Sequence, residues 1–220
     1  MERLRAVFKD PISGLTHLAS ALLALVGGVV LLFAAPASGP ARLAVLAYSA
    51  SLVLLFAASA SYHLVKTTPA RELLLRKLDH TAIFLLIAGT YTPVCVIVLT
   101  GGLRWGMLLA VWTMAVVGIG FKLITMRAPR WLSVAIYMAM GWLGALSFGP
   151  LFKLLPLPAI LWLAAGALLY TGGAIVYATR RLDFFPGVFG FHEVWHLFVT
   201  AASAALYVFV LGYVLPFGLR

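Results

Sequence analysis

The chain has 220 residues, of which 64% are hydrophobic and 10% are charged, and it carries a formal net charge of +10. Soluble domains are typically about 45–50% apolar and about 25% charged, so a soluble domain of this size could not bury so much apolar surface. The composition therefore excludes a soluble protein and indicates an integral membrane protein. The single cysteine, Cys95, excludes an intramolecular disulfide.

Seven apolar segments follow one another along the chain, each with the roughly 20 residues that a helix needs to cross the hydrocarbon core. A transmembrane barrel would instead show short segments of alternating polarity. We predict an all-α integral membrane protein, a seven-transmembrane helix bundle that forms a single domain over residues 1–220. The predicted spans are 13–35, 42–65, 80–100, 105–125, 132–152, 158–179 and 192–215.

The distribution of Lys and Arg predicts the orientation of the bundle. Twelve of the sixteen lie in the amino-terminal tail and in the second, fourth and sixth connections, and four lie on the other side. Because cytoplasmic loops are enriched in these residues, we expect a cytoplasmic N-terminus, an external C-terminus and a multi-pass location in the inner (plasma) membrane. The cations are dispersed rather than gathered into a stripe, so we expect no nucleic-acid partner.

All five histidines are predicted to lie at the cytoplasmic ends of spans: His17, His63, His80, His192 and His196. His192 and His196 are one helical turn apart on the same face, a spacing that lets two imidazoles bind one cation. We predict His63 as a third ligand, which leaves the fourth tetrahedral position open for water, as in a catalytic zinc site. The alternative is a pair of interfacial histidines that bond to neighbouring helices.

Two further polar residues are predicted within one helical turn of the depth of His63. Ser59 lies one turn deeper on the same helical face, and Asp79 lies across a short connection. Asp79 could instead be an ordinary helix N-cap or first-turn acid, and Ser59 a helix-packing serine. Glu193 points away from His192 and is expected to pair with a basic loop residue. His17 and His80 are not expected to be ligands.

Three motifs carry a family resemblance: "SASYH" (59–63), "KLDHTAIFLLIAGTYTP" (77–93) and "HEVWH" (192–196). Together they resemble the hemolysin III family, the bacterial branch of the progestin and adipoQ receptors in the superfamily that contains alkaline ceramidases. The resemblance implies zinc held by His63, His192 and His196, with Asp79 and Ser59 beside the metal-bound water. The stretch "DPISGLTH" (10–17) departs from the family, in which a Glu and an Asn often stand where this chain has Asp10 and Ser13.

Two functions remain open on these grounds. The first is a zinc-dependent hydrolase of membrane lipid amides, ceramidase-like and acting in membrane-lipid homeostasis, with Asp79 as general base and Ser59 orienting the water. The second is a non-enzymatic membrane sensor or regulator with a structural zinc. In both, the expected partner is a membrane lipid or a fatty acid. A pore is disfavoured, because the spans lack a recurrent polar stripe.

Overall fold

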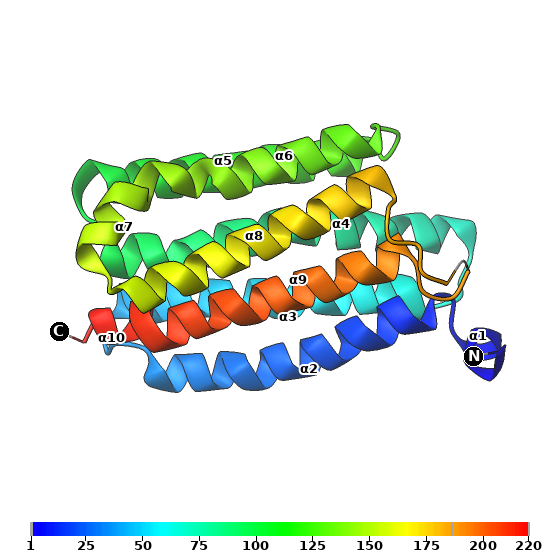
Figure 1. The fold of residues 1–220 in the computed structure, drawn as a ribbon, viewed down its shortest axis with the longest axis horizontal. Coiled ribbons are helices and arrows are strands. Elements are labelled where there is room, and N and C mark those ends of the chain that lie inside the picture. The colour runs from blue at the N-terminus through cyan, green and yellow to red at the C-terminus, as the bar shows by residue number, and fades with distance from the viewer. Residues whose placement is uncertain (1, 186, 220) are drawn as a thin grey trace.

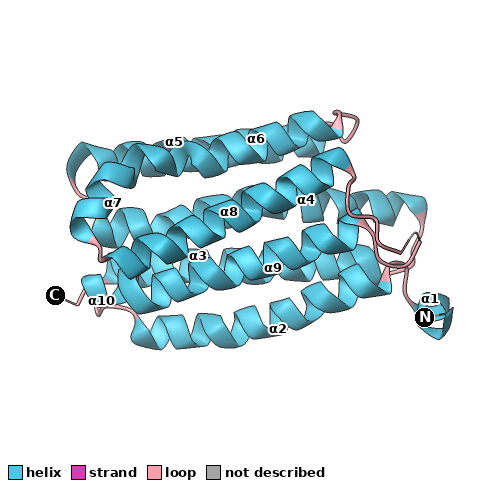
Figure 2. Ribbon diagram, in the orientation of Figure 1, coloured by secondary structure: helices cyan, strands magenta, loops and turns pink. Residues whose placement is uncertain are grey.

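Helices make up nearly all of the structure, a computed structural model that describes residues 2–185 and 187–219. Within these residues seven helices are long and apolar enough to cross a membrane, and no strand is found. The helices run along the longest axis of the molecule (Figure 1), and the loops gather at its two ends (Figure 2). The all-α prediction with seven helices of membrane-spanning length is confirmed.

Four of these candidate spans are unbroken α-helices: α2 (Pro11–Ala34), α3 (Gly39–Leu64), α5 (Gly101–Ile124) and α8 (Leu157–Thr179). Each of the other three spans combines several helical segments. The third span is α4 (Pro69–Pro93) followed by a π-helix (Val94–Val98), and the fifth is α6 (Arg130–Trp142) followed by a 3-10 segment (Leu143–Ser147) and α7 (Phe148–Leu154). The seventh is α9 (Phe191–Phe209) followed by a π-helix (Val210–Val214) and α10 (Leu215–Phe217). A short helix, α1 (Glu2–Val7), lies beyond one end of the bundle (Figure 1).

Proline stands in the first turn of α2, α3, α4 and α8, where its missing N–H is not needed by the helix. This explains why α4 begins at Pro69 rather than near residue 80, where the apolar segment starts. The stretch after Pro69 is rich in Leu, Arg, Lys and Glu, which favour helix. Asp79 therefore lies in the middle of a helix, and its interpretation as an N-cap or first-turn acid is wrong; Glu72 is the first-turn acid.

The order of packing brings the first and last spans together. α2 packs on α3, α3 on α4 and α4 on α5, while α8 packs on α9 and α9 returns to α2. The Ser20 hydroxyl on α2 consequently lies 3.1 Å from that of Thr200 on α9. Gly173 allows α8 to approach α9 closely, since a Cβ there would lie 2.6 Å from Phe198 and 2.9 Å from Trp195.

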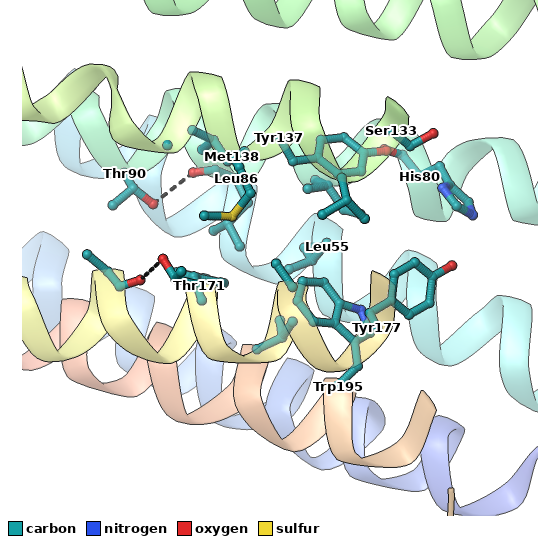
Figure 3. A pocket seen from close by; sticks show the side chains of 18 of the residues that line it. Leu55, His80, Leu86, Thr90, Ser133, Tyr137, Met138, Thr171, Tyr177 and Trp195 are labelled. Carbon is teal, nitrogen blue, oxygen red and sulfur yellow. Dashed lines mark hydrogen bonds between the residues drawn. The ribbon is translucent and has the colours of Figure 1, made fainter. Parts of the chain in front are cut away.

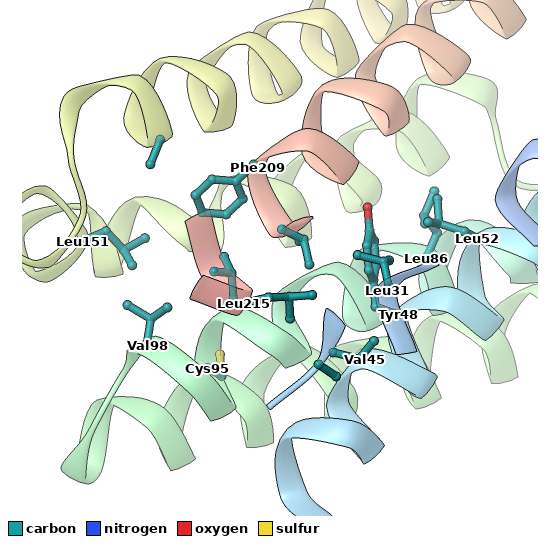
Figure 4. Packing of buried hydrophobic residues seen from close by; sticks show 14 of the residues in the cluster. Leu31, Val45, Tyr48, Leu52, Leu86, Cys95, Val98, Leu151, Phe209 and Leu215 are labelled. Atoms are coloured by element: carbon teal, nitrogen blue, oxygen red, sulfur yellow. The ribbon is translucent and has the colours of Figure 1, made fainter. Parts of the chain in front are cut away.

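Buried apolar side chains form a large cluster inside the bundle, and Figure 4 shows part of this cluster, including Tyr48, Phe209 and Leu215. The outer faces are equally apolar: Phe33 on α2 is 88% exposed and Leu109 on α5 is 72% exposed. Lipid tails are as apolar as these side chains, so their exposure fits a bundle surrounded by hydrocarbon.

Candidate metal centre

Three imidazoles converge at one end of the bundle. His63 lies in the last turn of α3, and His192 and His196 lie in the first turns of α9. The Nε2 atom of His192 is 3.3 Å from Nε2 of His63 and 3.2 Å from Nε2 of His196. All three potential ligand atoms lie within 4.8 Å of one another. The structure thus brings together the three residues that the sequence predicted as ligands.

The spacing of the three nitrogen atoms fits a metal ion. Zn–N bonds of about 2.0–2.1 Å at tetrahedral angles place two ligand nitrogens roughly 3.3 Å apart, close to the separations of 3.3 and 3.2 Å found here. A hydrogen bond between two imidazoles gives a similar distance, but it does not explain why a third ring points at the same place. Imidazole nitrogen suits zinc, copper, iron and nickel, so this donor set fits a transition-metal ion.

Asp10, immediately before α2, bonds to the Nδ1 side of the His63 ring. Its Oδ2 atom lies 3.1 Å from His63 Nδ1, and its backbone N–H donates to the His63 carbonyl oxygen at 2.7 Å. The hydrogen bond with His63 lowers the pKa of Asp10 below its ordinary value, despite the opposing effect of burial, so Asp10 is ionised at neutral pH. An ionised carboxylate only accepts, so Nδ1 carries the proton and the Nε2 lone pair is free for a metal.

Glu193 fixes the start of α9, on which two of the imidazoles lie. Its Oε2 atom accepts the backbone N–H of Gly190 at 2.9 Å, and its Oε1 atom accepts the hydroxyl of Ser13 at 3.0 Å. Among the described residues Glu193 forms no ion pair, so the expectation of a basic loop partner is wrong. The carboxylate instead caps α9 and ties it to α2, which sets the position of His192.

His17 on α2 supports His196 without joining the three imidazoles. Its ring lies 3.9 Å from that of His196, centroid to centroid, and its Nε2–H donates to the His196 carbonyl oxygen at 3.4 Å. His17, Ser13 and Asp10 all belong to the stretch that departs from the family pattern, and all three contact residues of the centre. Sequence reasoning left the role of this stretch in doubt, although the neighbouring acid and histidine were the signal that could have revealed it.

Ser59 and Asp79 lie next to the imidazoles but outside the group of three. Ser59 is buried one turn before His63 on α3, and Asp79 on α4 lines the same cavity as both residues. In the described part of the chain, the group of potential ligand atoms contains the three histidines and not Asp79. His80 also lies apart from it, with its backbone carbonyl accepting the Tyr137 hydroxyl at 3.1 Å.

The imidazoles open onto a cavity of about 700 Å³ inside the bundle, within the range of small-molecule sites. In Figure 3 the side chains of α4 and α6 face those of α8 and α9 across it. Beyond the polar end its walls are largely apolar, with Leu86, Met138 and Phe209 among the lining residues. On α4 alone the lining runs from Arg76 to Tyr91, roughly 20 Å of helix. The cavity can therefore hold an extended apolar chain.

The comparisons with known proteins agree with the motifs. The sequence model of the family described as Haemolysin-III related matches residues 5–207. The protein named Hemolysin-3 of Bacillus cereus is 38% identical over 219 residues, which cover 98% of this chain and 97% of that protein. The chain belongs to the hemolysin III family. The Hemolysin-3 homolog of Bacillus subtilis (strain 168) is 38% identical over 140 residues, 64% of this chain and 63% of that protein.

Membership of the hemolysin III family confirms the resemblance based on the three motifs. Together with the seven apolar helices, it identifies a multi-pass membrane protein with a possible three-histidine metal site.

Proposed function

We propose that this hemolysin III protein is a zinc-dependent hydrolase of membrane lipid amides that acts in membrane-lipid homeostasis. The observation that carries the proposal is the convergence of three imidazoles at the polar end of a largely apolar cavity. The cavity suits an acyl chain, and its polar end suits the amide that joins the chain to a headgroup. Three protein ligands, rather than four, are typical of catalytic zinc sites.

The residues around the centre suit amide hydrolysis. His63, His192 and His196 would hold the zinc, which would supply a Lewis acid for the carbonyl oxygen and would activate a water molecule at neutral pH. In this proposal Asp79 takes a proton from the attacking water and gives it to the leaving nitrogen, so a C–O bond forms as the C–N bond breaks. Ser59 donates a hydrogen bond to the developing oxyanion, and Asp10 keeps His63 in the tautomer that presents Nε2.

The proposal includes the orientation predicted from the sequence. A cytoplasmic N-terminus in the inner membrane places the metal centre at the cytoplasmic side, because His63 ends the second span and His192 begins the last one. Lys66, Arg71 and Arg76 lie at this same end of the bundle, as the enrichment of cytoplasmic ends in Lys and Arg requires.

The test is fatty-acid release from ceramides by purified protein loaded with zinc. Replacing Asp79 by Asn should lower the rate about 10²–10⁴-fold, since a general acid–base residue contributes on that order. Ser59→Ala removes the hydroxyl that is proposed to donate to the oxyanion and should also lower the rate. Its matched control is Ser61→Ala, because the Ser61 hydroxyl bonds within its own helix, to the Ala57 carbonyl oxygen. Equal release by zinc-loaded and chelated protein would rule the hydrolase out.

One observation favours a second function, a membrane sensor with a structural metal. The imidazoles come from α3 and α9, so a bound ion would link two helices that are far apart in the sequence. Stoichiometric zinc, no turnover and a large loss of stability on chelation would favour this alternative.

A further inference from the structure

Four cationic side chains, here called the group of cations, line the end of the cavity where the three histidines lie, and they belong to other helices than the histidines. Lys122 comes from α5, Arg130 from the start of α6, Arg76 from α4 and Arg180 from the residue after α8. Among the described residues none of the four forms an ion pair. The carboxylates in the lining are Asp10 and Glu193, which bond to His63 and Ser13, and Asp79, which forms no ion pair with a described residue. The positive charge of this group is therefore not matched by a bonded carboxylate.

Lys122 is the least expected member of the group. The residue is only 2% exposed, and its Nζ atom makes one hydrogen bond in the described part of the chain, to the Ser133 hydroxyl at 2.5 Å. An ammonium group has three donors, and a buried charge with a single neutral partner is costly. The enrichment of cytoplasmic ends in Lys and Arg explains cations at the membrane surface, but not one buried against a cavity.

Arg130 extends the group toward the metal centre. Its guanidinium carbon lies 4.8 Å from the centroid of the Tyr177 ring and 5.2 Å from that of Phe191, and one nitrogen donates to the Tyr177 carbonyl oxygen at 3.4 Å. The Tyr177 ring in turn lies 5.7 Å from the ring of His192. One aromatic ring thus separates this guanidinium from a predicted ligand. Figure 3 shows Tyr177 across the cavity from His80 and Ser133.

We propose that Lys122 and Arg130, together with Arg76 and Arg180 of the same cavity lining, form a subsite for the phosphate group of a lipid whose acyl chain occupies the cavity. Phosphate offers several acceptor oxygens to the free donors of Lys and Arg, and such charge-assisted bonds are strong. The adjoining apolar walls select a phosphate that carries a hydrocarbon chain. The inference rests on the proposed function in taking this lipid as the substrate, which would make the substrate an anionic lipid amide.

Binding measured without turnover tests the subsite. The probes are two ceramides with the same fluorescent acyl chain, one with a phosphate monoester and one without, titrated against chelator-treated protein in a neutral maltoside detergent. The phosphorylated lipid should bind at least about tenfold more tightly. Lys122→Met should remove most of this preference, while Lys122→Arg should keep it. Arg130→Met provides a second test if Lys122→Met does not fold.

The matched control is Arg127→Met, which removes the same charge at the same end of the bundle from an exposed residue that does not line the cavity. It should leave the preference unchanged. Equal affinities of the two ceramides, or equal losses in Lys122→Met and Arg127→Met, would overturn the subsite. Inorganic phosphate that bound as tightly as the phosphorylated lipid would assign the site to a free anion and overturn the lipid headgroup.

The same probes separate this inference from the hydrolase. A binding preference with no zinc-dependent fatty-acid release would support the subsite and contradict the hydrolase. Zinc-dependent release of fatty acid from both ceramides with no preference in binding would support the hydrolase and contradict the subsite.

Discussion

At the scale of single residues, the arrangement of the candidate metal centre depends on side chains that are not themselves ligands. Asp10 accepts from His63 Nδ1 at 3.1 Å, and Glu193 accepts from Ser13 and Gly190. These bonds choose the tautomer of one imidazole and the starting point of the helix that bears the other two. Such supporting partners of metal ligands commonly contribute 10–100-fold to metal affinity.

Removing the carboxylate of Asp10 should therefore weaken zinc binding. We expect Asp10→Ala to lower the affinity about 10–100-fold, and Asp10→Asn to lower it less, because the amide oxygen can still accept from Nδ1. The affinity is measured by competition with a chromophoric chelator. Glu72→Gln is the control. It removes the 3.2 Å ion pair between Glu72 and Lys9, the residue before Asp10, but no contact with His63. Unchanged affinity in Asp10→Ala would show that the hydrogen bond does not position a ligand.

At the scale of elements, close helix packing holds together the walls around the cavity. α4 and α5 meet at Gly118, where a Cβ would lie 2.2 Å from the ring of Phe84, a fully buried side chain. Gly120 lies on the same helix, and a Cβ there would meet nothing within 4 Å. The two glycines thus have opposite environments two residues apart.

This contrast predicts different effects of the same substitution. Gly118→Ala should lower the free energy of unfolding by about 1–3 kcal/mol, because a methyl group in a tightly packed contact forces the Phe84 ring or the backbone to move. Gly120→Ala should leave stability unchanged or raise it slightly, since alanine favours helix. Thermal unfolding of both variants in detergent checks this, and equal midpoints would contradict the packing of α4 against α5.

At the scale of the whole molecule, the candidate metal centre joins the beginning and the end of the bundle. α9 packs on α2, and its two histidines face His63 of α3. An ion bound there belongs to the folded state, because the unfolded chain does not hold the two helices together. Binding should therefore stabilise the entire bundle.

Removing the metal should lower the unfolding temperature of the purified protein. Free zinc at 100 times its dissociation constant contributes about 2.7 kcal/mol to the stability of the folded state. The shift on adding a chelator should vanish in His63→Ala and persist in His80→Ala, because His80 lies outside the group of three. The same shift in His63→Ala and in the unaltered protein would place the stabilising metal elsewhere.

The orientation of the bundle is open to a direct test. Cys95 is 1% exposed, so single cysteines introduced at the ends of helices report on the side of the membrane. A membrane-impermeant maleimide added to intact cells should label Gly39→Cys, which begins α3, and should spare Arg127→Cys, between α5 and α6. The reverse pattern would place the N-terminus and the metal centre outside.

The sequence alone determined the all-helical bundle and the three histidines, because both follow from local patterns. Spans are recognised by their length and hydropathy, and the spacing of His192 and His196 places them on one helical face. The predicted position of His63 at the same end of the bundle made it the third ligand, and the family motifs implied the same residue.

Only the tertiary structure decided what surrounds these histidines. Asp10 and His17 meet their partners His63 and His196 across long separations in the sequence, and Lys122 meets Ser133 on the next helix. No periodicity encodes such contacts. The start of α4 was also missed, because hydropathy marks where a chain enters lipid and not where its helix begins. The cavity between the three histidines and the group of cations exists only once α4, α6, α8 and α9 pack around it.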